Sequence, residues 1–279
     1  MTNPFDVLEP GQPYFAGIVA GLQSPLTRYL MMPTVVDTFS GADRPISILE
    51  IGSWVGMSAL VWAEAVNRFC PRKGAVLCID SWDPYFPAHD EMRVENENYA
   101  RMTRLAESGL AYQLFLHNAR CGPASVPIRH FRGASSDVLP YLADRSFDIV
   151  YIDGNHAYEH ARTDILQGVR LIRDGGILCG DDLELQWHEV DQEQTRQHSG
   201  SDAIFDMTHR ATYHPGVTRA VGELIGRVSW YFGFWAARKT GANFHSVDLR
   251  AVRTFVHGHL AEHYAAESQK AGTPLPTAE

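Results

Sequence analysis

Short apolar runs alternate with amphipathic stretches through the middle of the chain. The apolar runs are short enough for buried strands and are bounded by glycine, proline or polar residues. The expected strands are 46–52, 75–80, 128–133, 147–153 and 176–182. The expected helices of this region are 58–69, 102–119 and 135–144. Strands that alternate with helices predict βαβ units, and therefore an α/β fold with a parallel sheet.

The flanking segments have a different pattern. Residues 1–45 are rich in proline and glycine and predict a helical lead-in, and 46–240 form the expected core. Two connections exceed ordinary loop length, so we expect them to form a substrate-side lid or insertion. These are 81–127 and 184–215. The remaining expectations are a helix at 14–32, a helix at 217–226, a β-rich aromatic stretch at 228–239, and a C-terminal part, 241–279, made of a helix at 247–264 and a disordered tail.

Composition narrows the class of protein. The 279 residues are 45% hydrophobic and 20% charged, which is typical of a globular chain. The formal net charge of −9 argues against a nucleic-acid partner. The four cysteines have no zinc-like spacing. No leader pattern is visible, and no apolar stretch approaches the roughly 18 residues of a membrane span. These observations predict a cytoplasmic enzyme without a membrane partner.

Acidic residues follow the last two expected strands. Asp153 comes after one of them, and the pair Asp181 and Asp182 ends the other. Ligands of open α/β sheets bind beyond the carboxyl ends of the strands, so these carboxylates should meet at one site. Three clustered negative charges repel one another, and no lysine or arginine stands beside them in the sequence. A hard metal ion is the simplest candidate for the missing positive charge.

A glycine turn follows the first expected strand, in the sequence Glu50-Ile-Gly52-Ser53-Trp54-Val55-Gly56. Glycine lets the backbone approach a ligand, and the free N–H groups of the next helix favour an anionic group. A dinucleotide site would need glycine at position 54. Trp54 therefore disfavours a nicotinamide cofactor. The alternative is an ordinary turn between strand and helix.

Two further strand ends carry polar residues. Asp80 ends the second expected strand, where a carboxylate can bind both hydroxyls of a ribose. A solvated turn acid is the alternative. Ser135 and Ser136 follow the third strand, where either could equally cap the next helix.

Five segments, in this order, resemble class I S-adenosylmethionine-dependent methyltransferases: LEIGSWVGMSA, LCIDSW, RGASSDVLPYL, FDIVYIDGNH and GGILCGDD. They are most similar to the metal-dependent O-methyltransferases. This group includes catechol O-methyltransferase, with its GASQDIIPQL segment, and bacterial enzymes of the cephalosporin-hydroxylase-like and macrocin O-methyltransferase groups. The resemblance covers 46–182 well and 214–239 more loosely. It implies a Rossmann-like, doubly wound, mostly parallel seven-stranded sheet with helices on both faces.

The resemblance also implies a set of site residues. The cofactor would contact Glu50, Gly52, Ser53, Trp54, Gly56 and Ser58 at its methionine end, Asp80 and Ser81 at its ribose, Ala134, Ser135 and Ser136 at its adenine, and Asp153. The metal, Mg²⁺ or a similar ion, would be held by Asp153, Asp181 and Asp182. The catechol enzymes have asparagine at the third of these positions, which leaves the preferred metal open.

His156 stands where the catechol enzymes carry a catalytic lysine. Its unperturbed pKa suits proton removal at neutral pH, although it could instead only orient its loop. The implied reaction is methylation of a small-molecule hydroxyl on a sugar, phenol or secondary metabolite in natural-product biosynthesis. A divalent ion would lower the pKa of that hydroxyl, and His156 would accept the proton.

Several alternatives remain open at this point. They are a metal-independent or nitrogen-directed methyltransferase on the same core, a non-catalytic cofactor-binding protein, and a nicotinamide dehydrogenase. The aromatic segments 82–86 and 230–235 could form a substrate platform or pack in the core. The helix expected at 247–264 could support a homodimer.

Overall fold

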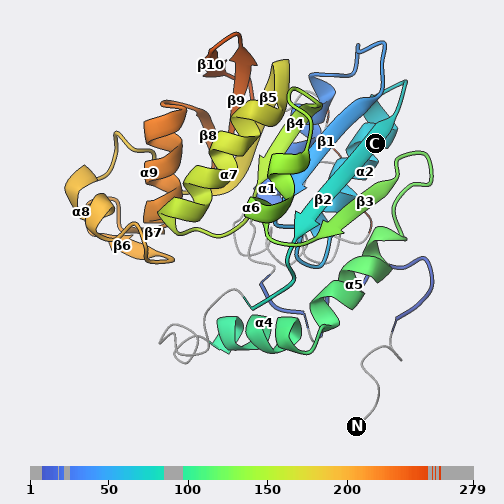
Figure 1. Cartoon of the computed structure of the whole chain (residues 1–279), viewed down its shortest axis with the longest axis horizontal. Helices are drawn as coiled ribbons and strands as arrows, with labels where there is room; N and C mark the ends of the chain where they lie inside the picture. Colours follow the sequence, from blue (N-terminus) through green and yellow to red (C-terminus); the bar gives the residue numbers. More distant parts are fainter. Residues whose placement is uncertain are drawn as a thin grey trace.

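The computed structural model describes residues 8–17, 19–21, 26–84, 97–250, 253, 255 and 258. Its centre is a sheet whose strands follow the order β10-β9-β5-β4-β1-β2-β3, with β8 paired to β9 (Figure 1). The strands are β1 (Ile46–Ile51), β2 (Gly74–Asp80), β3 (Ile128–Arg132), β4 (Phe147–Ile152), β5 (Ile172–Leu183), β8 (Ser229–Tyr231), β9 (Gly233–Thr240) and β10 (Asn243–Ser246).

The strand order has the switch point of a doubly wound sheet. Strands β1 to β5 pair with one another in parallel, and β9 pairs with β5 in the antiparallel direction. The chain moves outward from β1 through β2 to β3, then returns to the other side of β1 with β4 and β5. The Rossmann-like, mostly parallel α/β fold is therefore confirmed. Seven strands follow one another along the path, and the short β8 pairs with β9 as an eighth strand.

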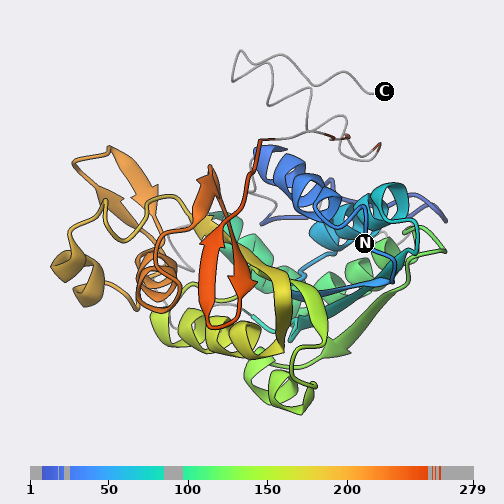
Figure 2. The same ribbon diagram turned by 90° about the horizontal axis from the view of Figure 1, so that it is seen from above.

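Helices cover both faces of the sheet (Figure 2). One face packs against α1 (Leu26–Asp37) and α2 (Met57–Phe69). The other packs against α7 (Tyr158–Leu171) and α9 (Pro215–Leu224), with the short α6 (Ser135–Val138) beside them. Helix α2 turns a continuous apolar side to the sheet and ends at Phe69, which is followed by Cys70 and then Pro71. The sheet therefore has two separate hydrophobic cores, one on each face.

The two expected insertions contain structure of their own. The first carries α4 (Glu97–Glu107) and α5 (Leu110–Ala119). The expected single helix at 102–119 was wrong, because Gly109 adopts a left-handed φ of 72° and breaks it. The second carries α8 (Gln192–Gln197) and a small hairpin of β6 (Ile204–Asp206) and β7 (Ala211–Tyr213). In Figure 1, α4 lies at the edge of the sheet towards which β2 and β3 point.

The lead-in differs from its expected form. The helix expected at 14–32 was wrong: α1 begins at Leu26 and ends at Asp37. Gly17 and Gly21 have φ values of 62° and 77°, which are incompatible with a continuous right-handed helix. The helix expected at 135–144 is also shorter, because α6 passes into a 3₁₀ turn, η2 (Leu139–Tyr141), that contains Pro140.

Some expected features lie outside the described residues. Most of the expected helix at 247–264 and the whole expected tail beyond it are among them. The segment 85–96 of the first insertion is another. Within the described part of the chain, no helix combines the length and apolar character needed to cross a membrane.

Candidate active site

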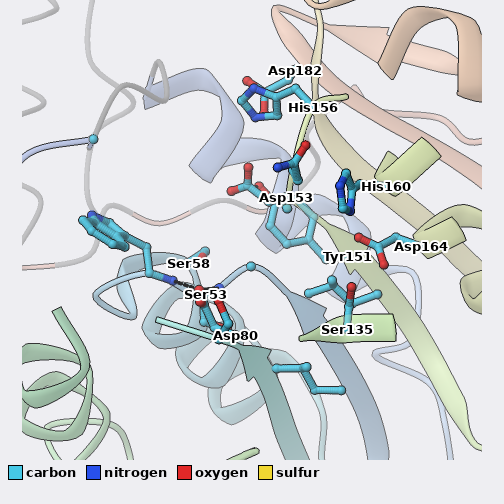
Figure 3. A pocket seen from close by; sticks show the side chains of 18 of the residues that line it. Ser53, Ser58, Asp80, Ser135, Tyr151, Asp153, His156, His160, Asp164 and Asp182 are labelled. Atoms are coloured by element: carbon cyan, nitrogen blue, oxygen red, sulfur yellow. Dashed lines mark hydrogen bonds and ion pairs between the residues drawn. The ribbon is translucent and has the colours of Figure 1, made fainter. Parts of the chain in front are cut away.

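A cavity of about 380 Å³ opens beyond the carboxyl ends of β1, β2 and β4 (Figure 3). This volume is typical of small-molecule sites, as is its position at the switch point between β1 and β4. The predicted site residues that line it are Gly52, Ser53, Trp54, Ser58, Asp80, Ser81, Ala134, Ser135, Asp153, His156 and Asp182. Glu50, Gly56, Ser136 and Asp181 were also predicted, but they do not line this cavity.

The glycine turn closes tightly against the loop after β4. Gly52 has a φ of 82°, and a Cβ atom there would collide with the backbone carbonyl of Asp153. Gly56 has a φ of 85° and precedes α2, and a Cβ atom there would lie 3.1 Å from the Phe115 ring. Both positions of the turn therefore favour glycine, and the one at position 52 lets the end of β1 lie against the loop after β4.

Asp80 anchors this turn through its carboxylate. Its Oδ2 accepts hydrogen bonds from the backbone N–H groups of Ser53 (2.9 Å) and Trp54 (2.8 Å), and its Oδ1 accepts one from Trp82 (2.7 Å). Burial raises the pKa of Asp80, while these three N–H groups counteract the rise. A carboxylate has about four acceptor positions, so room remains for a ribose hydroxyl. The ribose role stays a prediction, and a turn-stabilising role is directly visible.

Glu50 is not part of the cavity wall. It is fully buried, and its carboxyl accepts hydrogen bonds from the Ser58 hydroxyl and the Cys78 thiol. Burial raises its pKa to about 8, despite the opposing effect of these two donors. Glu50 is therefore mainly protonated at neutral pH, and its hydrogen-bond partner Ser58 lines the cavity.

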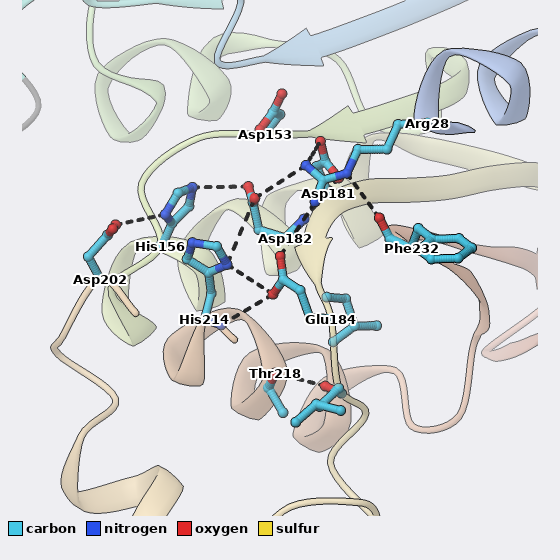
Figure 4. Close-up of polar contacts among 12 residues, drawn as sticks. Arg28, Asp153, His156, Asp181, Asp182, Glu184, Asp202, His214, Thr218 and Phe232 are labelled. Carbon is cyan, nitrogen blue, oxygen red and sulfur yellow. Dashed lines mark hydrogen bonds and ion pairs between the residues drawn. The ribbon is translucent and has the colours of Figure 1, made fainter. Parts of the chain in front are cut away.

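Arg28 supplies positive charge beside the acids of β5 (Figure 4). Its Nη1 lies 2.6 Å from Oδ2 of Asp181 and 3.5 Å from Oδ1 of Asp182, and its Nη2 lies 3.4 Å from Glu184. Its Nε donates to the carbonyl of Phe232 at 3.1 Å. Arg28 comes from α1, 153 residues from Asp181 in the sequence. The expectation that no arginine stands beside these acids holds for the sequence, but not for the fold.

His156 is held between two carboxylates. Its Nε2 lies 3.0 Å from Oδ2 of Asp182, and its Nδ1 lies 2.8 Å from Oδ1 of Asp202. The hydroxyl of Tyr99 donates to the other oxygen of Asp202 at 2.5 Å. Burial favours the neutral ring, but Asp182 and Asp202 outweigh it and raise the pKa of His156 well above its usual value. Tyr99 and Asp202 come from the two insertions, which therefore meet at His156.

His214 joins the same cluster from the N-terminus of α9. Its Nδ1 lies 3.0 Å from Oε2 of Glu184 and 3.8 Å from Oδ1 of Asp182, and its ring centre is 4.3 Å from that of His156. Burial lowers the pKa of His214, but the carboxylates of Glu184 and Asp182 raise it overall. Asp182 is therefore contacted by both histidines and by Arg28.

The cluster contains donor sets that could share one cation. Within the described chain there are three such sets of three residues, and the donor atoms of each set lie within 4.8 Å of one another. The sets are Asp153, His156 and Asp182; Asp182, Glu184 and His214; and His156, Asp202 and His214. Asp153 and Asp182 were predicted ligands, and the structure brings them together. Asp181 belongs to none of these sets, and its carboxylate binds Arg28 instead.

Arg28, Tyr99, Asp202 and His214 contact the site, although none was predicted as a site residue. His214 had a weak signal, because it lies in the second expected lid. The other three are brought in by long-range packing of the lead-in and insertions, which leaves no local sequence pattern.

Comparison with known proteins agrees with this architecture. Residues 49–183 match the profile of a family described as "Methyltransferase domain". A protein of Mycobacterium sp. (strain JLS) named "Putative O-methyltransferase" is 30% identical over 132 residues. That match covers 47% of this chain and 46% of the relative, so the chain matches less than half of the relative's length.

Solved structures with similar chains include methyltransferases. An O-methyltransferase from Bacillus cereus in complex with SAH is 20% identical, with a TM-score of 0.42, over 78% of this chain and 83% of that one. The O-methyltransferase TomG from Streptomyces achromogenes, in complex with SAM, is 21% identical, with a TM-score of 0.39, over 80% and 82%. Residues 49–183, which carry the glycine turn and the strand-end acids, therefore match the family described as a methyltransferase domain.

Proposed function

We propose that this protein transfers the methyl group of S-adenosylmethionine to a hydroxyl of a small molecule. The observation that carries this proposal is the cavity at the switch point. Asp80 and Ser135 line one part of it, and Asp153 and His156 line another (Figure 3). The first group suits a nucleoside with an amino-acid tail, and the second suits an acceptor that must lose a proton.

The proposed cofactor position follows the chain's own hydrogen-bonding groups. The backbone and hydroxyls of Ser53 and Ser58 would face the methionine end, and the remaining acceptor positions of Asp80 would face the ribose. Ala134 and Ser135 line the cavity at the start of α6, where the adenine is expected. These residues orient the donor, and correct orientation of two reactants supplies much of the rate in a transfer reaction.

A divalent cation fits part of the predicted ligand set. Asp153 and Asp182 offer carboxylate oxygens close to each other, and oxygen ligands suit Mg²⁺. Asp181 fits less well, because its carboxylate is engaged by Arg28. We therefore propose Asp153 and Asp182 as the principal ligands, with Asp181 joining only if Arg28 releases it. A bound divalent ion would lower the pKa of an acceptor hydroxyl.

His156 is the proposed proton acceptor. A histidine accepts a proton only in its neutral form, whereas Asp182 and Asp202 favour the charged form. Asp202 binds Nδ1 and so orients the ring with Nε2 towards Asp182 and the cavity. The two carboxylates thus stabilise the imidazolium that proton transfer creates.

The proposed acceptor is a sugar, a phenol or another secondary metabolite, and natural-product biosynthesis is the proposed setting. The acceptor side of the cavity includes Tyr99 and Met102 from the first insertion and His214 from the second. The mixture of aromatic, apolar and titratable groups suits a polar organic molecule better than a nucleic acid. The net charge of −9 also disfavours nucleic acid, and we propose a cytoplasmic enzyme that acts without a membrane.

Three measurements test the proposed function. Calorimetry should detect binding of S-adenosylmethionine to the full chain, and methyl transfer to a panel of hydroxyl compounds should yield labelled methyl ethers. Chelation with EDTA should abolish turnover, and added Mg²⁺ should restore it. Full turnover in EDTA would instead support a metal-independent enzyme. Cofactor binding without any transfer, including to amines, would support a non-catalytic binding protein.

A further inference from the structure

One of the three donor sets contains none of the acids that follow β4 or end β5. It consists of His156 in the loop after β4, Asp202 just before β6, and His214 just before α9. Their donor atoms lie within 4.8 Å of one another. Two imidazole rings and one carboxylate therefore come together from three separate segments of the chain (Figure 4).

Neighbouring carboxylates hold the two rings in defined orientations. Nδ1 of His214 lies 3.0 Å from Oε2 of Glu184, so Nε2 is the nitrogen left for a ligand. Nε2 of His156 lies 3.0 Å from Asp182, and its Nδ1 lies 2.8 Å from Oδ1 of Asp202. Histidines that bind a metal through one nitrogen typically have a carboxylate at the other, which fixes the ring. Both rings have this arrangement.

Asp202 brings a buried negative charge to the set. Its side chain is 3% exposed. Its Oδ1 faces His156, and the hydroxyl of Tyr99 donates to its Oδ2 at 2.5 Å. Buried carboxylates are paired with cations or bind metals, and the Tyr99 contact orients this one with Oδ1 towards the two rings. Each of the three donors therefore has an outer contact that holds it in place.

The donor atoms determine the class of ion that suits this set. Imidazole nitrogen suits Zn²⁺ and neighbouring transition metals, whereas Mg²⁺ takes oxygen ligands. Two histidines and one carboxylate leave a fourth tetrahedral position open for water. The set therefore differs in metal preference from the carboxylate oxygens of Asp153 and Asp182.

We propose that His156, Asp202 and His214 bind a divalent transition-metal ion of the Zn²⁺ class, at a site separate from the proposed Mg²⁺ ligands. The ion joins the second insertion to the loop after β4. It binds Nδ1 of His156 and leaves Nε2 facing Asp182, as in the structure described above. The inference does not depend on methyl transfer, so it and the proposed function can fail separately.

X-ray absorption at the zinc edge tests the site without any variant. The untagged full chain would be loaded with one equivalent of Zn²⁺ in excess Mg²⁺. We expect two imidazole nitrogens per zinc at about 2.0–2.1 Å, together with oxygen ligands. Each of the other two donor sets contains a single histidine. One imidazole per zinc, or none, would therefore overturn the proposal.

Calorimetry with Zn²⁺ tests the individual ligands. The wild-type chain should bind one Zn²⁺, and excess Mg²⁺ should change the affinity by less than about threefold, because nitrogen ligands disfavour Mg²⁺. Tyr99→Phe removes an outer contact and should weaken Zn²⁺ binding by about tenfold. Asp202→Asn and His214→Gln each alter a ligand, so each should weaken binding by about a hundredfold or more.

Two control variants identify where the ion binds. His209→Gln removes another histidine of the second insertion, in the turn between β6 and β7, and should leave the Zn²⁺ affinity unchanged. Asp153→Asn should also leave it unchanged, because Asp153 belongs to a different donor set. Wild-type affinity in both Asp202→Asn and His214→Gln would overturn the proposal. So would loss of binding in Asp153→Asn with binding retained in Asp202→Asn, or displacement of Zn²⁺ by Mg²⁺.

Discussion

The buried ion pair between Arg28 and Asp181 allows a quantitative stability prediction. The two side chains are 8% and 1% exposed, and Nη1 lies 2.6 Å from Oδ2. Arg28→Met keeps most of the side-chain volume but removes the charge, so Asp181 is left as a buried carboxylate beside Asp182. Removing one partner of a buried pair costs about 3–5 kcal/mol. We expect Arg28→Met to lower the free energy of unfolding by about this amount.

Urea unfolding at pH 7.5, followed by circular dichroism, measures this change. The double variant Arg28→Met/Asp181→Asn should regain about half of the loss or more, because the second substitution removes the buried charge that Arg28 paired with. The matched control is Arg72→Met. Arg72 pairs with Asp43 on the surface, where the two side chains are 62% and 88% exposed, so its loss should change the free energy of unfolding by less than about 1 kcal/mol.

Two results would refute this reasoning. One is a change for Arg28→Met as small as that for Arg72→Met, which would mean that water or another cation solvates Asp181 without Arg28. The other is a double variant no more stable than the single one, which would mean that the loss comes from packing and not from the stranded charge.

Three further predictions follow from the geometry of the site. Gly52→Ala should abolish S-adenosylhomocysteine binding in calorimetry, because its Cβ would collide with the Asp153 carbonyl; Gly241→Ala, also at positive φ but in open space, should bind normally. The folded pKa of Glu50, about 8, exceeds the unfolded value of 4.5, so the wild-type free energy of unfolding falls as pH rises between these values. Between pH 5 and 8, urea titrations should therefore show the free energy of unfolding of Glu50→Gln rising relative to wild type by about 1.4 kcal/mol per pH unit. Parallel plots of this free energy against pH for the two proteins would contradict the prediction. Asp202→Asn should move the acid limb of the kcat/KM profile to lower pH, because Asp202 raises the pKa of His156, and an unmoved limb would exclude His156 as the titrating base.

The central strands could be predicted because burial on both faces makes them continuous apolar runs. The observed bounds of β1 to β4 differ from the expected ones by one residue at most. Strand β5 begins at Ile172, earlier than expected, because the polar and glycine-rich 173–176 resembles a loop in the sequence. Ile172 nevertheless pairs with Phe147 of β4, so the tertiary ladder overrides local propensity here.

The site residues at strand ends could be predicted from the sequence. Those brought in by the packing of α1 and of the second insertion could not. Asp153 and Asp182 come together because parallel strands deliver their carboxyl ends to one edge. Arg28 reaches the same edge only because α1 packs against the sheet, and Asp202 only because the second insertion folds back over His156. No periodic pattern in the neighbouring sequence signals either contact. Considering only the charges of residues adjacent in the sequence therefore predicted a metal ion beside these acids. The fold also brings Arg28 to them.

A crystal structure of the full chain with S-adenosylhomocysteine tests the central claim most directly. We predict that the ligand lies in the cavity at the switch point, with its ribose beside Asp80, its adenine beside Ser135, and its sulfur towards Asp153 and His156. Density for the ligand elsewhere on the chain, or an orientation that turns the sulfur away from His156, would contradict the account.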